Sequence, residues 1–591
     1  MGSRAGRSCL ITALALACTS GAMAQSVVVT GSWAPLPLEE ADRSVVSLPA
    51  RSQNLLLNTF VDLLKLDPSL DLQQRAPNGL QGDLSIRGAT FGQTLVLLNG
   101  HRLSDPQSGH HSLDLPIPLQ SIQSIEVLRG AGSTLYGSDA LGGVVNVISA
   151  PPETSEIRLR VAAGNFGVNQ QSGSLAAVRG ALSEQLTFSR DFSSGFMPNR
   201  DYRNLSLGSG TAWRSRLGTT GLDLGLADKP FGAQGFYGAY PSWERTKTWF
   251  AGLRQSLGER TEAGVSYRRH SDLFYLFRDN PQRYQNHHVA ESWQASLRRH
   301  DPLRQNITLF YGAEGTGEKI ESSNLGRHSR ARVATYASLD VRALGRFSFS
   351  AGVRSESYRG AFDEISPTIS AGYWAASKLK FRAAVSRAYR LPTFTELYYR
   401  DPANQGNAAL LAERAWSYEG GADYRPTAHW RLQTTLFHRQ DRNGIDYMSG
   451  SPSGPWVARN IGSLNFTGVE GSAALQWRGQ VLDWSYTGLR GVSQLLPGVY
   501  TKYSFNYPVH SGVFSWTANL PGSLTARTRV GAAERRGRGA YAVWDLYLAR
   551  ARGPVRPFVQ FTNLSNARYQ EILTIPMPGR AIVGGVELVI R

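Results

Sequence analysis

Most of this chain alternates between apolar and polar residues with a period of two. Residues 262–268 read Glu-Ala-Gly-Val-Ser-Tyr-Arg and residues 347–354 read Phe-Ser-Phe-Ser-Ala-Gly-Val-Arg. The same alternation recurs at 430–436 and again at 582–590. In an extended strand it places apolar side chains on one face and polar side chains on the other. We therefore expect β-strands from about residue 156 onward.

These strands are expected to form a closed barrel in a membrane. After the first 24 residues no apolar run reaches the length of a membrane-spanning helix, and a closed barrel is the other structure that satisfies every backbone group in lipid. Aromatic residues at strand ends, such as Trp243 and Tyr398, argue against a soluble sandwich or propeller. The length of the region fits about 22 strands.

The first 24 residues predict a secretory signal peptide. Arg4 and Arg7 precede the apolar stretch 10–18, and Ala-Met-Ala at 22–24 is a small-residue cleavage site. Cys9 and Cys18, the two cysteines of the sequence, both lie in this segment. The exported chain would therefore contain no disulfide.

Residues 49–150 predict a small mixed α/β domain. Apolar residues at 53–64 have helical spacing, and 84–86, 94–98, 122–128 and 143–148 are strand-like. Asn-Gly at 99–100 favours a tight hairpin turn. The glycine-rich stretch 130–137 lacks the Gly-Lys-Ser/Thr ending of a phosphate-binding loop, so a nucleotide site is not expected.

Four motifs of this region occur in the order typical of one family. They are Ile-Arg-Gly at 86–88, Leu-Leu-Asn-Gly at 97–100, Ile-Glu-Val-Leu-Arg-Gly at 125–130 and Leu-Tyr-Gly at 135–137. Together they resemble the plug domain of TonB-dependent outer-membrane receptors. Residues 387–398 with 406–413, and 460–462 with 468–471, resemble barrel signatures of the same family.

The resemblance implies an all-β transmembrane barrel of about 22 antiparallel strands, with an N-terminal mixed α/β plug domain inside the lumen. The expected divisions are a signal peptide at 1–24, a Ton box and linker at 25–48, the plug at 49–150 and the barrel at 151–591. The implied location is the outer membrane of a Gram-negative bacterium. We expect a monomer that is inserted by the barrel assembly machinery and surrounded by outer-membrane lipid.

The resemblance also implies a protein partner at the N-terminus. Val27, Val28, Val29 and Thr30 follow the cleavage site and resemble a Ton box, the segment that offers a strand to the energy-transducing protein TonB and its inner-membrane motor complex. An ordinary first strand of the plug is the alternative interpretation. Residues 25–48 are expected to form an exposed arm, because Pro35 and Pro37 discourage a helix.

In this family, plug arginines pair with barrel glutamates and hold the plug in place. By position these would be Arg87 and Arg129 against Glu470 and either Glu419 or Glu413. A guanidinium buried inside a barrel needs a carboxylate partner. Charges that face a water-filled lumen without partners are the alternative.

Ligand contacts are harder to locate. His110, His111 and Tyr284 are candidates for contact with a ligand, although solvated loop residues are the favoured interpretation of the histidines. Two adjacent histidines on a strand would face opposite sides and chelate poorly, so no metal site is expected. No histidine occurs from 329 to 427, where haem receptors of the family carry one, so haem is disfavoured.

The chain carries a formal net charge of +18, and removing residues 1–24 leaves +16. The excess is mostly arginine spread along the sequence, which favours a polar lumen and lipopolysaccharide-facing loops over nucleic-acid binding. No catalytic motif is present, and neither an enzyme nor a cofactor is expected.

The expected function is TonB-dependent active uptake of a small-molecule metal complex. The arginine excess favours an anionic ferric siderophore. Residues 136–146, Tyr-Gly-Ser-Asp-Ala-Leu-Gly-Gly-Val-Val-Asn, look cobalamin-receptor-like and favour cobalamin as the alternative cargo. A passive pore or an adhesive barrel is the alternative from another class, and it would not need a folded plug.

Overall fold

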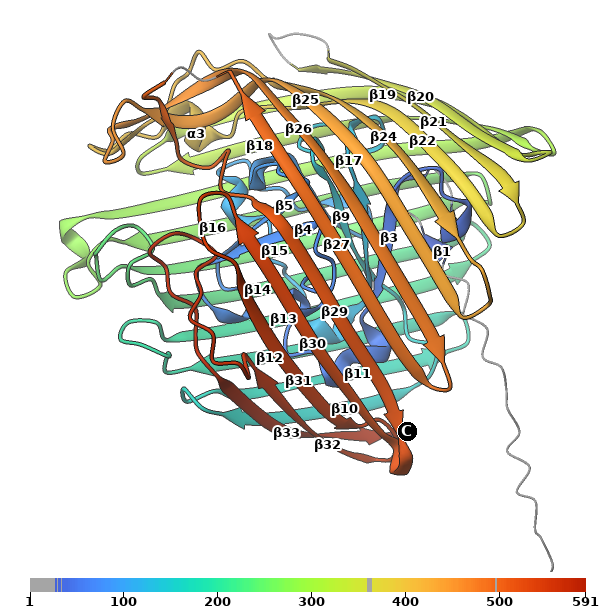
Figure 1. Ribbon diagram of the computed structural model, residues 1–591, viewed down its shortest axis with the longest axis horizontal. Helices are drawn as coiled ribbons and strands as arrows, with labels where there is room; N and C mark the ends of the chain where they lie inside the picture. The colour runs from blue at the N-terminus through green and yellow to red at the C-terminus, as the bar shows by residue number, and fades with distance from the viewer. Residues whose placement is uncertain (1–26, 29, 33–34, 359–363, 495–496) are drawn as a thin grey trace, which may run out of the picture.

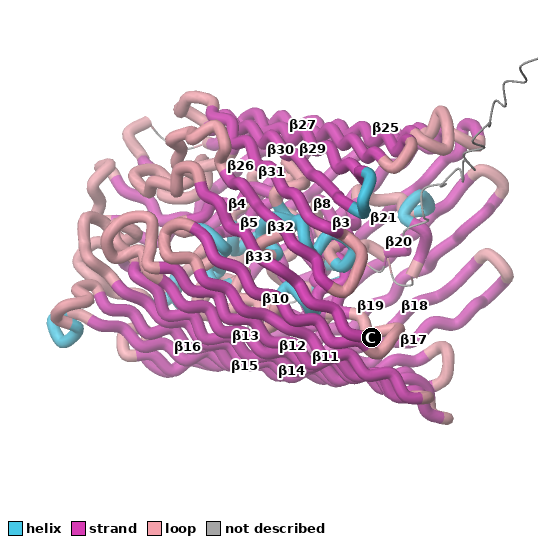
Figure 2. Tube along the Cα trace, turned by 90° about the horizontal axis from the view of Figure 1, so that it is seen from below, coloured by secondary structure: helices cyan, strands magenta, loops and turns pink. Residues whose placement is uncertain are grey.

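The structure, a computed structural model, describes residues 27–28, 30–32, 35–358, 364–494 and 497–591. The expected signal peptide and Val29 lie outside the described residues. Figure 1 shows a wall of long strands around an N-terminal domain drawn in blue. Figure 2 shows short helical segments inside the same wall. No helix in the described part of the chain is long and apolar enough to cross a lipid bilayer.

The wall is a closed antiparallel barrel of 22 long strands, as the sequence predicted. Neighbouring strands in the sequence pair with each other, and the last strand pairs with the first, with Ile157 opposite Ile590. Two-residue strands β23 and β28 pair alongside the wall. The strands are β10 (Glu156–Gly164), β11 (Asn169–Arg179), β12 (Leu182–Ser193), β13 (Tyr202–Ser215), β14 (Gly218–Gly232), β15 (Trp243–Leu257), β16 (Thr261–Tyr275), β17 (Gln285–Arg304), β18 (Ile307–Ser322), β19 (Gly326–Leu344), β20 (Phe347–Tyr358), β21 (Glu364–Ala376), β22 (Leu379–Arg390), β23 (Asn404–Gln405), β24 (Glu413–Tyr424), β25 (Trp430–Ser449), β26 (Trp456–Trp477), β27 (Gln480–Ser493), β28 (Tyr500–Thr501), β29 (Pro508–Leu520), β30 (Leu524–Arg535), β31 (Tyr541–Arg550), β32 (Val555–Thr562) and β33 (Ala581–Ile590).

The period-two pattern separates the two faces of the barrel. In β16 the side chain of Val265 is exposed on the outside, whereas Arg268 and His270 are buried inside. In β20 exposed Phe347 and Val353 alternate with inward residues in the same way. Backbone groups are satisfied between neighbouring strands, so the apolar outer face can contact lipid without a hydrogen-bonding cost.

The two ends of the barrel differ in the length of their connections. At one end tight turns such as 180–181 and 216–217 join the strands. At the other end lie longer loops, among them 391–412, which contains α3 (Phe394–Tyr398), and 563–580. In outer-membrane barrels the short turns are periplasmic and the long loops are extracellular. We use "inner end" for the short turns and "outer end" for the long loops.

The domain inside the barrel has a five-stranded sheet in the order β3-β8-β9-β6-β7 and a separate hairpin β4-β5. Leu63, Ile86, Val96 and Val127 are among the residues of its apolar core. Its strands and helices are β3 (Val45–Pro49), β4 (Leu70–Gln74), β5 (Gly82–Ile86), β6 (Thr94–Leu98), β7 (His101–Arg102), β8 (Ile122–Arg129), β9 (Gly143–Ser149), α1 (Phe60–Leu64) and α2 (Ser133–Tyr136). We call this domain the plug.

Two local predictions in the plug have different outcomes. Asn99 and Gly100 both have positive φ, 51° and 85°, and join β6 to β7 as the expected hairpin. The prediction that residues 25–48 form an exposed arm is wrong for the second half of this segment, which belongs to the plug. β3 pairs with β8, from Val45 opposite Leu128 to Pro49 opposite Ser124, because its apolar side chains complete the plug sheet.

Candidate functional site

Arg87 joins the plug to the barrel wall through two carboxylates. Its Nε and Nη2 donate to the two carboxylate oxygens of Glu470 at 2.8 Å each, and its Nη1 donates to Glu419 Oε2 at 2.8 Å. The three side chains are at most 4% exposed. Arg87 follows β5 with a positive φ of 53°, and Gly88 continues the turn at 73°. This turn ends β5 where the guanidinium reaches the wall.

Arg129, at the end of β8, contacts the same glutamate. Its Nη1 lies 3.3 Å from Glu470 Oε2, and its Nη2 donates to Asp67 Oδ2 at 2.7 Å. The Arg87 guanidinium also lies 4.4 Å from the ring centroid of Phe437. Burial by itself would lower the pKa of Arg87, but the adjacent carboxylates of Glu470 and Glu419 raise it above its ordinary value. The Arg87 guanidinium of the plug is therefore held by two carboxylates of the wall.

Glu413, the alternative partner from the sequence, is engaged elsewhere. It forms an ion pair with Arg390 and accepts a hydrogen bond from the backbone N–H of Ile445. All of these groups belong to the barrel. Glu413 and Glu419 lie on the same face of β24, and the height of Arg87 in the lumen brings it to Glu419.

The candidate Ton box lies at the inner end of the plug. Val27–Val28 forms β1, which pairs with β2 (Leu36–Pro37). The backbone N–H of Thr30 donates to Glu126 Oε2 at 2.7 Å, and Thr30 Oγ1 accepts from Asn146 Nδ2 at 3.0 Å. Thr30 is fully buried. The end of the segment is thus fastened to strands β8 and β9 of the plug sheet.

His110 and His111 lie in a short 3-10 helix, η5 (Gly109–His111), near the outer end of the plug. His110 stacks on Phe91 with ring centroids 4.0 Å apart, and its Nδ1 lies 2.7 Å from Asp83 Oδ1. His111 is buried, with 5% exposure. The favoured interpretation as solvated loop residues is wrong for His111. The helical turn, unlike a strand, directs His111 toward the barrel wall.

Tyr284 belongs to a different group of residues. It precedes β17, and its hydroxyl lies 3.4 Å from the hydroxyl of Tyr399, which follows α3. Asn286 Nδ2 lies 3.4 Å from the same Tyr284 hydroxyl. The group therefore joins two outer loops.

Two family models match this chain. One, described as "TonB dependent receptor-like, beta-barrel", matches residues 181–565, and another, "TonB-dependent Receptor Plug Domain", matches residues 38–144. The first covers more than half of the sequence. The chain belongs to the TonB-dependent receptor family. It is therefore an outer-membrane protein of the receptor and transporter class.

This receptor is similar, at low sequence identity, to curated transporters and to receptors of known structure. The Vitamin B12 transporter BtuB of Photobacterium profundum is 24% identical over 417 residues, which cover 66% of each chain, just under two thirds. The Vitamin B12 transporter BtuB of Vibrio vulnificus is 24% identical over 482 residues, 75% of each chain. The crystal structure of the siderophore receptor PirA from Acinetobacter baumannii has a TM-score of 0.76 at 14% identity, covering 92% of this chain and 98% of that one. This likeness supports the shared fold.

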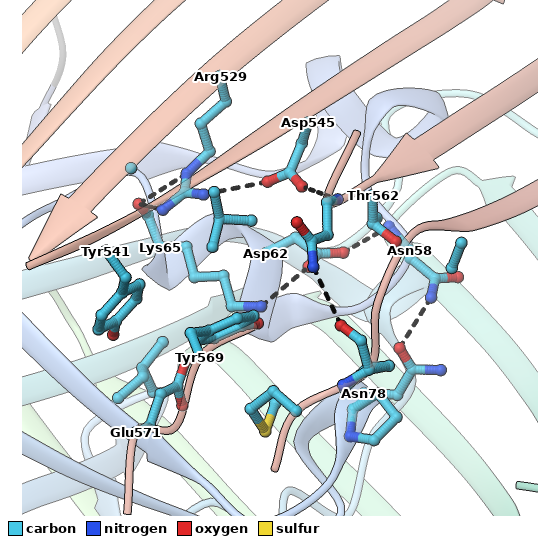
Figure 3. A pocket seen from close by; sticks show the side chains of 18 of the residues that line it. Asn58, Asp62, Lys65, Asn78, Arg529, Tyr541, Asp545, Thr562, Tyr569 and Glu571 are labelled. Atoms are coloured by element: carbon cyan, nitrogen blue, oxygen red, sulfur yellow. Dashed lines mark hydrogen bonds and ion pairs between the residues drawn. The ribbon is translucent and has the colours of Figure 1, made fainter. Parts of the chain in front are cut away.

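A cavity of about 190 Å³, lined by both polar and apolar side chains, separates the plug of the receptor from one side of its wall. Figure 3 shows residues of α1 and its neighbours, among them Asn58 and Lys65, facing Arg529 and Asp545 of the wall. Arg529 Nε donates to the backbone oxygen of Lys65 at 3.1 Å, and its Nη1 lies 3.0 Å from Asp545 Oδ2. At the same cavity Asp71 of β4 pairs with Arg535 of β30, and both side chains are buried. Ion pairs between plug and wall are therefore present on this side as well as on the Arg87 side.

Sequence reasoning missed several charged residues around the outer part of the plug. Asp67 pairs with Arg129, and the loop 104–115 places Asp105 and Asp114 against His270 of the barrel. His111 of the same loop lies 3.6 Å from Asp272 of the barrel. The alternation in β16 carries a signal for the two barrel residues, since Arg268, His270 and Asp272 share the inward face. No spacing in the sequence indicates that Asp105 and Asp114 of the plug lie next to these barrel residues.

Proposed function

We propose that this receptor takes up a large, scarce nutrient complex across the outer membrane with energy supplied by TonB. The observation that carries the proposal is the plug itself, which fills the lumen and is fixed to the wall by buried ion pairs from Arg87 to Glu470 and Glu419. A plug held in this way blocks passive flow of a large solute, so passage requires work on the plug. The passive-pore alternative lacks this support.

The segment 27–30 is where we place the TonB contact. β1 already has strand geometry and pairs with only two residues of β2. A TonB strand that replaced β2 would gain main-chain hydrogen bonds by β-augmentation. Thr30 connects this segment to Glu126 of β8 and Asn146 of β9. A pull on the segment would thereby reach the plug sheet that ends at Arg129, a partner of Glu470.

For the cargo we propose a corrinoid of the cobalamin type. The two sequence relatives above are vitamin B12 transporters by name, and the stretch 136–146 of the plug looks like that of cobalamin receptors. A ferric siderophore, the cargo favoured by the sequence analysis, is the second candidate. Cationic residues in the outer loops, such as Arg278, Lys502, Arg536 and Arg538, favour an anionic chelate.

Binding to the purified receptor separates the two cargoes. Cyanocobalamin and an anionic ferric catecholate are titrated at low and at high salt. The proposal expects saturable cyanocobalamin binding that changes little with salt, since cobalamin has no net charge to screen. Binding of the ferric chelate alone, weakening as salt rises over the Debye range of about 3–10 Å, would replace the corrinoid by a siderophore. Growth of a receptor-deletion strain on the same two nutrients tests uptake.

A further inference from the structure

Two histidines and one aspartate converge where the outer loop of the plug meets the barrel. His111 and Asp114 come from the plug loop 104–115, and His270 comes from β16 of the wall. One donor atom from each of the three lies within 4.8 Å of the others. The residues are 5%, 7% and 0% exposed. A buried imidazole pair next to a carboxylate is a donor set that first-row transition metals favour.

The spacing of the donor atoms fits a single ion. His270 Nε2 lies 3.2 Å from Asp114 Oδ2, and His111 Nδ1 lies 3.7 Å from the same oxygen. Two ligands each about 2.0–2.1 Å from a tetrahedral Zn²⁺ are separated by about 3.3 Å. The observed separations therefore require only small side-chain adjustments. Asp114 Oδ1 is occupied by Lys229 Nζ at 3.0 Å, which leaves Oδ2 for the ion.

The other ring nitrogen of each histidine faces a carboxylate. Asp105 Oδ2 lies 2.8 Å from His270 Nδ1, and Asp272 Oδ2 lies 3.6 Å from His111 Nε2. Histidine ligands of metal sites commonly present their second nitrogen to a carboxylate in this way, which fixes the ring orientation and raises the basicity of the ligand. His270 thus has the outer partner that a metal ligand needs, and His111 has a carboxylate nearby at a distance longer than a hydrogen bond.

The charge of the buried cluster also leaves room for a dication. Lys229 pairs with Asp114, and Arg268 Nη1 pairs with Asp105 at 2.9 Å. These are two cations against four buried carboxylates, because the same cluster contains Asp105, Asp114, Glu244 and Asp272. With all four carboxylates ionised and both histidines neutral, the cluster has two excess negative charges, which two protons, on Glu244 and His111, would also remove. Uncompensated charge is costly away from water, so a divalent cation would offset it.

We propose that His111, Asp114 and His270 bind one divalent transition-metal ion, with Zn²⁺ as the best-fitting example. Asp105 and Asp272 orient the two imidazoles. Because the ligands come from both the plug and β16, the ion fastens the outer loop of the plug to the wall. A fourth coordination position is left for water. The site does not depend on the cargo of the receptor, and it differs from the sequence-based expectation of no metal site.

The test uses the full exported chain, purified in detergent and stripped with a chelator. Co²⁺ is titrated in, and its visible absorption reports four-coordinate binding. Zn²⁺ competition then gives the Kd. The proposal expects one ion per chain and, for Zn²⁺-loaded wild type, an X-ray absorption spectrum with two imidazole ligands. His270→Gln should weaken Zn²⁺ binding by at least about 100-fold, beyond the loss caused by removing an outer partner.

His110→Gln is the matched control, since His110 is adjacent in sequence but pairs with Asp83. It should bind Zn²⁺ as wild type does. Thermal unfolding and heat-modifiable gel mobility verify that each variant is folded. The X-ray absorption spectrum of the wild type tests the proposal even if a variant fails to fold. The proposal is overturned if wild type takes up no stoichiometric Co²⁺ or Zn²⁺. It is also overturned if folded His270→Gln binds Zn²⁺ as tightly as wild type. In either case the excess negative charge of the cluster would be neutralised by bound protons.

Discussion

Replacing Glu470 with Ala should loosen the plug from the barrel wall. The change removes the two carboxylate oxygens of Glu470, each of which accepts from Arg87 at 2.8 Å. It also removes one contact of Arg129. Breaking a buried pair by removing one partner costs about 3–5 kcal/mol. Arg87 keeps Glu419 at 2.8 Å and Arg129 keeps Asp67 at 2.7 Å. We therefore expect the lower end, about 3 kcal/mol.

Hydrogen exchange measured by mass spectrometry gives the readout. A loss of about 3 kcal/mol corresponds to roughly 100-fold faster local opening, since 1.4 kcal/mol is a factor of ten. The acceleration should be confined to peptides that contain 84–88 and 125–130. Glu470→Gln, which keeps an acceptor but loses the charge, should give an intermediate effect.

Glu413→Ala is the matched control for this experiment. It also removes a carboxylate from a buried pair, with Arg390, but that pair lies entirely within the barrel. It should leave exchange of the two plug segments unchanged. Equal exchange in wild type and Glu470→Ala, or equal acceleration by the Glu413 variant, would show that the Arg87 pairs do not hold the plug.

Three further predictions concern the N-terminal strand, a plug turn and a plug histidine. Val28→Pro should leave cargo binding intact and abolish uptake of labelled cargo, because proline removes a donor from the TonB-facing strand. Gly88→Ala should lower the melting temperature more than Gly100→Ala, because both have positive φ but a Cβ at Gly88 would lie 2.7 Å from Phe466. Burial lowers the pKa of His110 below 6.5 despite Asp83, so its stabilising contribution is present above that pH and is lost as pH falls. Melting temperatures from pH 7.5 to pH 5 should therefore fall further for wild type than for His110→Gln.

The barrel was predictable because its signal is repeated along the sequence. Each strand must present apolar residues to lipid, so the alternation around Val265 or Phe349 recurs in strand after strand, and the chain length sets the number of strands. The hairpin at Asn99-Gly100 was predictable for a local reason, since its two positive φ values suit these two residues.

The partners inside the lumen were less predictable. The alternation along a strand shows which side chains point inward, but it does not show how far along the barrel axis they lie. Glu413 and Glu419 both point inward from β24. Arg87 pairs with Glu419 because of the level at which it lies along the barrel axis. His111 was misjudged because adjacent histidines diverge on a strand, whereas η5 is helical. His270 and Asp114, 156 residues apart in sequence, come together only when the plug enters the barrel.

The pairing of β10 with β33 sets the order in which this molecule can be assembled. The first and last wall strands meet along one seam, with Ile157 opposite Ile590, so the cylinder cannot shut until its C-terminal residues are in place. The plug precedes β10 directly, and a short tether at 150–155 keeps it beside that seam. An incomplete wall is an open sheet with a gap next to the plug's own attachment. Entry of the plug through this gap, followed by closure, avoids threading a folded domain through a finished ring. Pairing of the first wall strand with the last is then also the step that encloses the plug.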